Sequence, residues 1–201
     1  MKQLALPFAE RQDYAAEDFC PAPSNAMARD WLAHPQAWSH GRLVLWGEAG
    51  CGKTHLLHIW AAANQALLLN GATLQGQWHP TQPVVVDDSD IVPDPCVLLH
   101  LLNEAAAAAQ PVLLASRLRA AQSVEIRAPE DALLEMLLMR LAAARQLALG
   151  ITVQNFLLTR LPRTAAHMRE AIARLDHAAL DRGIRITRQT AAEILADLIL
   201  G

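Results

Sequence analysis

The fold is decided by residues 42–60, which read Arg42-Leu-Val-Leu-Trp-Gly47-Glu-Ala-Gly50-Cys-Gly52-Lys53-Thr54-His55-Leu-Leu-His58-Ile-Trp60. The apolar residues before Gly47 predict a short buried strand, and those after Thr54 predict an amphipathic helix. Between them, Gly47 is followed after four residues by Gly52-Lys53-Thr54, which fits the phosphate-binding pattern G-x-x-x-x-G-K-[ST]. The strand and the helix that this pattern requires are both indicated, so a coincidental glycine turn is the weaker interpretation.

Each residue type in this loop has a physical reason. Glycine lets successive backbone N–H groups turn inward, and the following helix adds unpaired N–H groups and a positive dipole end. Lys53 would neutralise the β- and γ-phosphates, and Thr54 would offer its hydroxyl to Mg²⁺. The sequence therefore predicts a site for ADP or ATP with Mg²⁺. The predicted nucleotide-binding residues are Gly47, Glu48, Ala49, Gly50, Cys51, Gly52, Lys53, Thr54 and His55.

Composition and charge narrow the classes to which the protein can belong. The 201 residues are 53% hydrophobic and 18% charged, which predicts one large domain, or an α/β domain with a small satellite. The net charge of −3 argues against stand-alone binding of duplex DNA, because such proteins normally carry a basic surplus. Three scattered cysteines suit a reducing compartment, and the sequence shows neither a signal peptide nor an apolar run of membrane-spanning length. We expect a cytoplasmic protein with no membrane partner.

Short apolar runs alternate with helical patterns up to residue 128. A helix is expected from about Ala26 to Ala33, with Ser24 or Asn25 as its N-cap. The other expected elements are the strands Leu43–Trp46, Ala66–Asn70, Val84–Val86, Pro111–Ser116 and Val124–Ile126, and the helices Lys53–Asn64 and Pro95–Ala109. This order predicts an α/β fold with a parallel sheet, helices on both faces and a site at the carboxyl ends of the strands.

Two acidic residues follow the third of these strands. Val84-Val85-Val86 predicts a buried parallel strand that delivers Asp87 and Asp88 to the carboxyl edge of the sheet. In phosphate-loop proteins an acid at this place holds the Mg²⁺ shell, which makes Asp87, with Thr54, the candidate metal ligand. Asp88 would polarise the attacking water.

After Pro129 the pattern is helical throughout. The expected helices are Asp131–Leu147, a second from a Thr152 cap to Leu161, Arg163–Arg182 with Gly183 as its stop, and a fourth from a Thr187 cap to Leu200. Four helices without a strand predict a small helical domain. The expected organisation is an N-terminal tail at 1–17, a nucleotide-binding core at 18–128 and a helical lid at 129–201.

The N-terminus carries an isolated apolar hexapeptide, residues 3–8. Because it is too short to build a core, it must pack on its own domain or bind a partner in extended form. Gln-Leu-Ala-Leu-Pro-Phe resembles the short peptides by which many bacterial proteins bind the β sliding clamp of the replisome. A tail that packs on its own domain is the alternative, and the position near Met1, together with the rest of the chain, favours the clamp. The candidate clamp-binding residues are Gln3, Leu4, Leu6, Pro7 and Phe8.

The run Gly-Lys53-Thr54-His55-Leu-Leu-His58, with Val-Val-Val-Asp87-Asp88, resembles the AAA+ module of the DnaA family of bacterial replication initiators. With the clamp-like peptide, the chain resembles the Hda group of DnaA-related regulators over nearly its whole length. The resemblance implies a P-loop AAA+ fold: a three-layer αβα core with a parallel five-stranded sheet, followed by a small all-helical lid domain. From its length, the chain is not expected to include the helix-turn-helix domain of DnaA.

The resemblance also implies a function. Hda-like proteins bind a nucleotide, tether to the DNA-loaded clamp and dock on ATP-bound DnaA, whose ATP hydrolysis they stimulate. The implied partners are therefore the β sliding clamp and the DnaA initiator, without direct sequence-specific DNA binding. Intrinsic ATPase activity would be weak at most, and self-association into a homo-oligomer stays open, as does the choice between ADP and ATP.

Three residues are carried over as catalytic: Asp88, Arg117 and Arg169. Arg169 matches the arginine that a lid helix directs at the γ-phosphate of its own site; taken alone it would be a solvated helix charge. Arg117 is the candidate arginine finger, which would reach the γ-phosphate of the partner.

The segment around Arg117 departs from the family pattern. Family members usually place a loop and a helix between the polar residue that ends the fourth strand and the Ser-Arg-Leu segment with the finger. Here Ser116-Arg117-Leu118 follows the strand at once, so Ser116 serves as the strand-end residue or as part of the finger motif. Either the chain has lost that element, or residues are missing from the sequence; the second interpretation is favoured because Arg117 then falls within the finger motif.

Other functions stay open. A phosphate loop also serves small-molecule kinases and robust ATPases, in which Arg160, Arg163 and Arg169 would act on substrate phosphates. Helicase loaders share the DnaA-like core. His55 and His58 share a helix face, but without a third ligand nearby they predict packing, and no metal beyond Mg²⁺ is expected.

Overall fold

The structure is a computed structural model that describes residues 14–119 and 123–200. By its internal contacts the chain divides after residue 128 into an αβα unit, Tyr14–Ala128, and a helical unit that begins at Pro129. Each unit has a hydrophobic core of its own. Within the described ranges, no helix has both the length and the apolar character needed to cross a membrane.

The αβα unit is built on a five-stranded sheet with the order β2-β3-β4-β1-β5. All neighbouring strands are parallel, which confirms the predicted sheet. The strands are β1 (Arg42–Trp46), β2 (Leu67–Asn70), β3 (Val84–Asp87), β4 (Val112–Ser116) and β5 (Ser123–Glu125). Because all five run in the same direction, the residues that follow them collect at one edge of the sheet.

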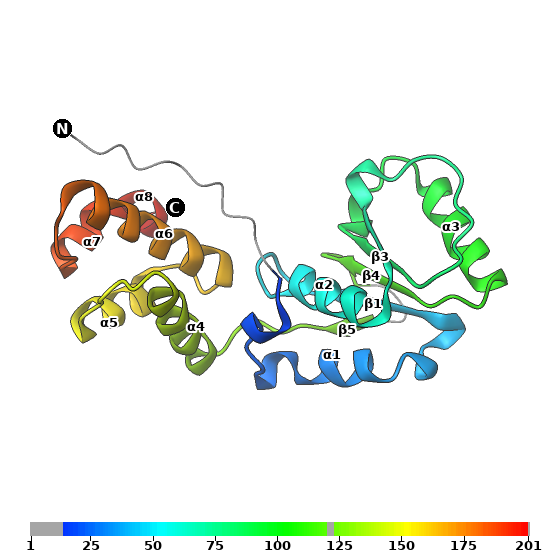
Figure 1. Ribbon diagram of the computed structural model, residues 1–201, viewed down its shortest axis with the longest axis horizontal. Coiled ribbons are helices and arrows are strands. Elements are labelled where there is room, and N and C mark those ends of the chain that lie inside the picture. Colours follow the sequence, from blue (N-terminus) through cyan, green and yellow to red (C-terminus); the bar gives the residue numbers. More distant parts are fainter. Residues whose placement is uncertain (1–13, 120–122, 201) are drawn as a thin grey trace. The chain divides into compact units, whose positions relative to one another are not determined.

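Helices cover both faces of this sheet, as Figure 1 shows. The helices α1 (Pro23–Ala33) and α2 (Lys53–Asn64) belong to the core on one face, and α3 (Pro95–Ala107) belongs to the core on the other. Successive side chains of a strand point to opposite faces. Val85 therefore packs in the α1–α2 core, whereas Val84 and Val86 pack in the α3 core. Burial on both faces explains why β3 is continuously apolar instead of alternating.

Helix α1 begins three residues earlier than predicted. Ala22 is its N-cap and Pro23 its first residue, so the predicted caps Ser24 and Asn25 lie inside the first turn. Proline is favoured there because its missing N–H would have no partner in the helix. The Asn25 side chain still serves the helix start, since it accepts a hydrogen bond from the Ala22 N–H at 3.1 Å and donates one to the Cys20 carbonyl.

In the described residues the helical unit contains five α-helices. These are α4 (Asp131–Ala144), α5 (Ile151–Arg160), α6 (Ala165–Arg182), α7 (Arg188–Ile194) and α8 (Ala196–Leu200). One core joins them, with the fully buried Leu138, Leu157, Met168, Ile172 and Leu175 at its centre. The all-helical character predicted for the region after Pro129 is confirmed.

Several predicted boundaries in this unit were wrong. Helix α4 ends at Ala144 and not at Leu147, and α6 begins at Ala165 and not at Arg163. Gly150 is the N-cap of α5, and Thr152 lies inside the helix. The last predicted helix is two helices, because the chain leaves helical geometry at Leu195, whose side chain is fully buried. The Thr187 cap is confirmed, and so is the stop at Gly183, which ends α6 in the left-handed conformation with φ 60°.

Candidate nucleotide-binding site

The predicted phosphate-binding loop connects β1 to α2 and is shaped by its glycines. Gly50 and Gly52 have φ angles of 78° and 104°, which residues with a side chain rarely adopt. Gly47 is required by a close approach: a Cβ there would lie 2.5 Å from the carbonyl oxygen of Ile126 and 2.9 Å from Cys51 Sγ. The loop therefore packs against the chain just after β5 and leaves no room for a side chain at its first position.

Lys53 reaches back over the loop. Its Nζ donates hydrogen bonds to the carbonyl oxygens of Gly47 at 2.7 Å and Glu48 at 2.9 Å, and the residue is only 8% exposed. Both acceptors are neutral, and an ionised acceptor would make stronger bonds to an ammonium group. The positive charge is thus held against the loop by contacts that a phosphate could replace.

The first turn of α2 adds further donors. Gly52 is the N-cap, and no described side chain caps this end of the helix. The first backbone N–H groups therefore lack an intrahelical acceptor, and the helix dipole gives this end a partial positive charge. A glycine loop that leads into such a helix start is suited to bind phosphate oxygens.

Cys51 packs inside the loop. Burial raises the pKa of its thiol, whereas the nearby Lys53 charge acts in the opposite direction. Because the thiolate is the reactive form, a raised pKa leaves the side chain as an unreactive thiol. Its sulfur, beside Gly47, fills space in the loop.

Strand β3 brings Asp87 and Asp88 to the same edge of the sheet as the loop. Val86, the residue before Asp87, is level with Leu114 on β4, and Leu114 is level with Val44 on β1. Neighbouring strands lie about 4.8 Å apart, so the backbone of Asp87 is about 10 Å from β1. Asp87 therefore ends a strand that lies two positions from β1, at the edge of the sheet where the loop begins.

The Asp87 carboxylate also acts on α2. Burial lowers the pKa of the His58 imidazole, the negative charge of Asp87 raises it, and His55 lowers it further. Asp88 has a left-handed backbone with φ 51°, and its N–H donates to Asp87 Oδ1 at 3.0 Å.

Ser116 and Arg117 follow β4 at this edge. Arg117 Nε lies 3.3 Å from Asp90 Oδ2, and the Asp90 side chain is 8% exposed, against 54% for that of Arg117. Ser116 Oγ accepts a hydrogen bond from the Leu118 N–H at 2.8 Å. Arg117 is thus bound by its own subunit through Asp90, a residue that sequence reasoning did not single out although it stands two positions after Asp88.

His55 and His58 pack on the segment that precedes α1. The Tyr14 ring stacks on His58 with a centroid distance of 4.2 Å, and the Phe19 ring meets His55 edge-on at 5.2 Å. His55 Nε2 also lies 2.9 Å from the Ala15 carbonyl oxygen. The two histidines therefore attach residues 14–19 to α2 beside the loop, a contact that the sequence did not indicate.

The remaining predicted site residues lie elsewhere. Arg169 belongs to α6 of the helical unit and is half-buried. Arg163, just before that helix, is ion-paired with Asp131. The clamp-like peptide Gln3–Phe8 lies outside the described residues. The roles of Arg169 and of this peptide stay predictions.

Comparison with known proteins finds relatives of the helical unit and of the fold. Residues 131–189 match the family model described as the lid domain of Hda. The structure resembles domain III of the Thermotoga maritima replication initiation protein DnaA with a TM-score of 0.79 and 18% identity, over 94% of this chain and 98% of that one. The chain thus joins the fold of DnaA domain III to a helical segment that matches the Hda lid family.

Two further structures share this fold. A replication initiator DnaA bound to AMPPCP and single-stranded DNA matches with a TM-score of 0.65 and 14% identity, over 92% of this chain and 68% of that one. The Thermotoga maritima RuvB Holliday junction branch migration motor matches with a TM-score of 0.64 and 17% identity, over 88% and 70%. No curated protein sequence matches the chain. The predicted AAA+ core and helical lid, and the resemblance to the DnaA family, are confirmed.

Proposed function

We propose that this AAA+ protein is a nucleotide-binding regulator of bacterial DNA replication initiation that tethers to the β sliding clamp and stimulates ATP hydrolysis by the initiator DnaA. The observation that carries the proposal is the glycine cradle with the buried Lys53, set in a DnaA-like sheet and followed by a lid of the Hda family. The likeness to a DnaA bound to AMPPCP supports an adenine nucleotide as the ligand.

In this proposal the phosphates of ADP or ATP bind in the loop at residues 47–54. Phosphate oxygens replace the carbonyl oxygens of Gly47 and Glu48 as hydrogen-bond partners of Lys53. Because a phosphate is ionised, its hydrogen bonds to Lys53 are stronger than those of the neutral carbonyls. Thr54 and Asp87 would hold Mg²⁺, which would supply positive charge to the phosphates.

Hydrolysis at this site is proposed to be weak. Asp88 would polarise a water, and Arg169 of the lid would contact the γ-phosphate of the same site. Asp88 belongs to the αβα unit and Arg169 to the helical unit.

Arg117 is the residue proposed to act on DnaA. To do so, the Arg117 side chain would leave Asp90. Asp90 Oδ1 accepts a hydrogen bond from the backbone N–H of Arg117 at 3.4 Å and would retain that bond. Breaking a fully buried ion pair costs about 3–5 kcal/mol, and the loss is smaller here because the Arg117 side chain is half exposed although Asp90 is nearly buried. An arginine finger accelerates hydrolysis by about 10³ to 10⁵. The exchange therefore favours Arg117 reaching the γ-phosphate of DnaA once that partner docks.

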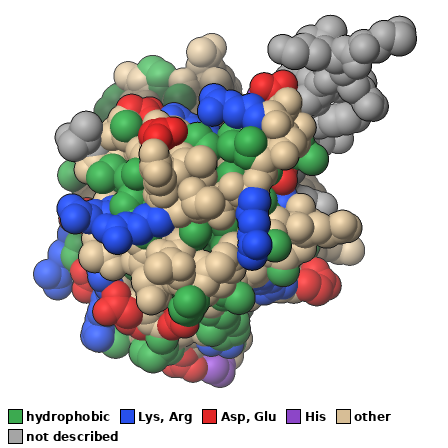
Figure 2. Space-filling view, turned by 90° about the vertical axis from the view of Figure 1, so that its left-hand side faces the viewer, with side chains coloured by type: hydrophobic (Ala, Val, Ile, Leu, Met, Phe, Trp, Pro, Cys, Tyr) green, Lys and Arg blue, Asp and Glu red, His purple; other side chains and the backbone are tan. Residues whose placement is uncertain are grey.

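The clamp supplies the attachment to DNA in this proposal. The net charge of −3 gives the chain no basic surplus of its own. On the face drawn in Figure 2, basic side chains alternate with acidic and apolar ones and form no continuous basic surface. The peptide Gln3–Phe8 would bind the clamp in extended form.

The test reconstitutes the reaction with ATP-bound DnaA, clamp loaded on DNA, and this protein with ADP. We expect hydrolysis of DnaA-bound ATP to accelerate only when all three are present. Arg117→Ala should abolish the acceleration, whereas Arg119→Ala should retain it, because that arginine lies over the Trp46 ring at 5.8 Å. A wild-type protein that leaves DnaA hydrolysis unchanged would contradict the proposal.

Co-elution with the clamp tests the tether separately. Wild type should co-elute, and the double variant Gln3→Ala, Phe8→Ala should not, with Lys2→Ala as the neighbouring control. Binding to the replicative helicase instead of the clamp would indicate a helicase loader. Steady phosphate transfer to a small acceptor by the isolated protein would indicate a kinase.

A further inference from the structure

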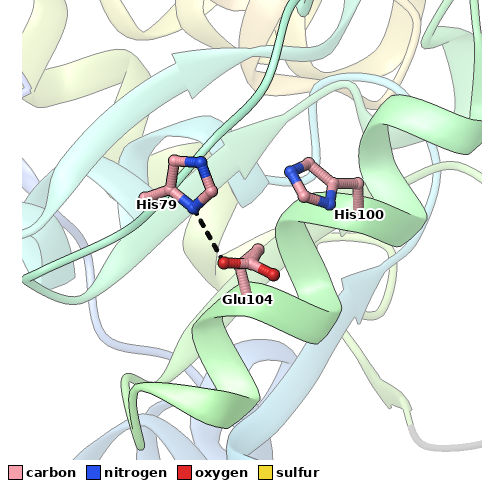
Figure 3. Close-up of side chains that lie close together, drawn as sticks. All are labelled: His79, His100 and Glu104. Carbon is pink, nitrogen blue, oxygen red and sulfur yellow. Dashed lines mark hydrogen bonds and ion pairs between the residues drawn. The ribbon is translucent and has the colours of Figure 1, made fainter.

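Three metal-binding side chains meet between α3 and the connection that joins β2 to β3. His79 comes from this connection, and His100 and Glu104 come from α3. Each offers one ligand atom, and these atoms all lie within 4.8 Å of one another (Figure 3). We propose that His79, His100 and Glu104 bind a Zn²⁺ ion that attaches the connection to α3.

The geometry suits a tetrahedral ion. His100 and Glu104 are four residues apart, so they lie on one face of the helix. His79 Nδ1 and Glu104 Oε2 are 2.8 Å apart, and the two imidazole rings are 5.8 Å apart between centroids and perpendicular. Zn²⁺ with bonds of 2.0–2.1 Å separates its ligand atoms by about 3.3–3.4 Å. The His79–Glu104 pair, at 2.8 Å, is somewhat closer than this spacing, and the exposed His79 side chain is not fixed by burial.

His100 supplies the second observation. Its Nε2 is buried, and within the described part of the chain it has no hydrogen-bond partner. Buried polar atoms almost always have a partner, because an unmade hydrogen bond leaves the desolvation of the group uncompensated. The His100 ring faces the pair formed by His79 and Glu104 (Figure 3). A metal ion between the three would use the nitrogen lone pair that packing leaves unused.

The donor set selects the metal. Two imidazoles and one carboxylate suit Zn²⁺, whereas Mg²⁺ and Ca²⁺ take oxygen ligands. Three protein ligands leave the fourth position to water. The site lies at α3, on the face of the sheet opposite to α2, so it is separate from the proposed Mg²⁺ at Thr54 and Asp87.

The test is a Zn²⁺ titration of the metal-free full-length protein by calorimetry, in the presence of ADP and excess Mg²⁺. We expect one Zn²⁺ per chain. His79→Asn, His100→Gln and Glu104→Gln should each weaken binding by more than about 10-fold, the least that an outer-shell change costs at a metal site. The far-UV circular dichroism and the ADP affinity of each variant should equal those of wild type, which excludes unfolding as the cause.

Two matched controls should bind Zn²⁺ as wild type does. His34→Asn removes a histidine that also stands four residues from an acid, since His34 Nδ1 lies 3.7 Å from Asp30 Oδ1 on α1. Cys96→Ser removes the thiol that stands one helical turn before His100. Less than one Zn²⁺ per chain, undiminished binding by His100→Gln, or equal losses in a control variant would overturn the proposal. As an independent readout, Co²⁺ in the wild-type site should give a tetrahedral spectrum without sulfur charge transfer, and a sulfur band would likewise count against it.

Discussion

Replacing Gly47 by alanine should destabilise the αβα unit through one identifiable contact. The added Cβ would lie 2.5 Å from the Ile126 carbonyl oxygen and 2.9 Å from Cys51 Sγ, closer than real Cβ atoms come to other atoms. The sulfur can turn away, but the carbonyl belongs to the backbone and cannot move alone. The loop must therefore shift away from the chain that follows β5.

The magnitude has two parts. Holding a residue with a side chain at positive φ costs about 1–2 kcal/mol, and forcing extra atoms into a packed site costs about 1–3 kcal/mol. Gly47→Ala should incur both and lose about 2–5 kcal/mol of unfolding free energy. Gly76 is the matched control, because its φ is 81° and a Cβ there meets nothing within 4 Å. Gly76→Ala should lose only the about 1–2 kcal/mol of unfolding free energy that comes from positive φ.

Tryptophan fluorescence during urea unfolding measures this difference. The chain has five tryptophans, all in the αβα unit, so the signal reports on that unit: Trp31, Trp38, Trp46, Trp60 and Trp78. Gly47→Ala should lower the urea midpoint more than Gly76→Ala, with the slope unchanged. It should also weaken ADP binding, because the displaced loop would no longer present its backbone N–H groups to the phosphates. Equal midpoints for the two variants and an unchanged ADP affinity would refute the reasoning.

Three further predictions concern single side chains. Lys53→Ala should weaken ADP binding by about 2–5 kcal/mol in calorimetry, because a buried charged contact to phosphate is lost; equal affinities would mean that the loop is not used. Thr164→Ala should cost about 1 kcal/mol in unfolding followed by circular dichroism, because the Thr164 hydroxyl caps α6; an unchanged midpoint would show that the cap is unimportant. Hydrogen bonds from Arg174 hold the pKa of Asp197 below its usual range. The pair therefore stabilises the folded protein fully at pH values above the ordinary carboxyl pKa, and this stabilisation is lost as the pH falls through the lowered pKa of Asp197. Both groups are exposed, so Asp197→Asn should cause a small loss at neutral pH that disappears in acid and shrinks with salt; a loss that persists in acid would contradict the assignment.

Much of the αβα unit could be predicted because its signals are local. The bounds of α2, Lys53–Asn64, agree with the prediction, since the glycine before Lys53 and the polar Asn64-Gln65 mark both ends within the sequence. The three consecutive valines of β3 indicate burial on both faces, which requires a covered parallel strand. Such patterns depend on neighbours in the chain, and neighbours are visible in a sequence.

The boundaries that were missed depend on distant contacts. The pattern from 188 to 200 is helical throughout, but the chain breaks its helix at Leu195, whose side chain joins the core of the helical unit. For α1, the prediction placed Asn25 at the cap because of its residue type. The observed side chain serves the same helix start from one turn further on, with the Cys20 carbonyl as a second partner.

By itself, the sequence determined that a phosphate loop joins a strand to a helix, that acids follow a buried strand, and that a helical region comes last. Only the tertiary structure decided that β4 lies between β1 and β3, that Arg117 meets Asp90 across 27 residues, and that His79 meets Glu104 across 25. Periodicity specifies which face of an element is apolar. Which elements become neighbours is decided by how those faces are buried together, and pairs so far apart in the chain become visible only once the strands are in order.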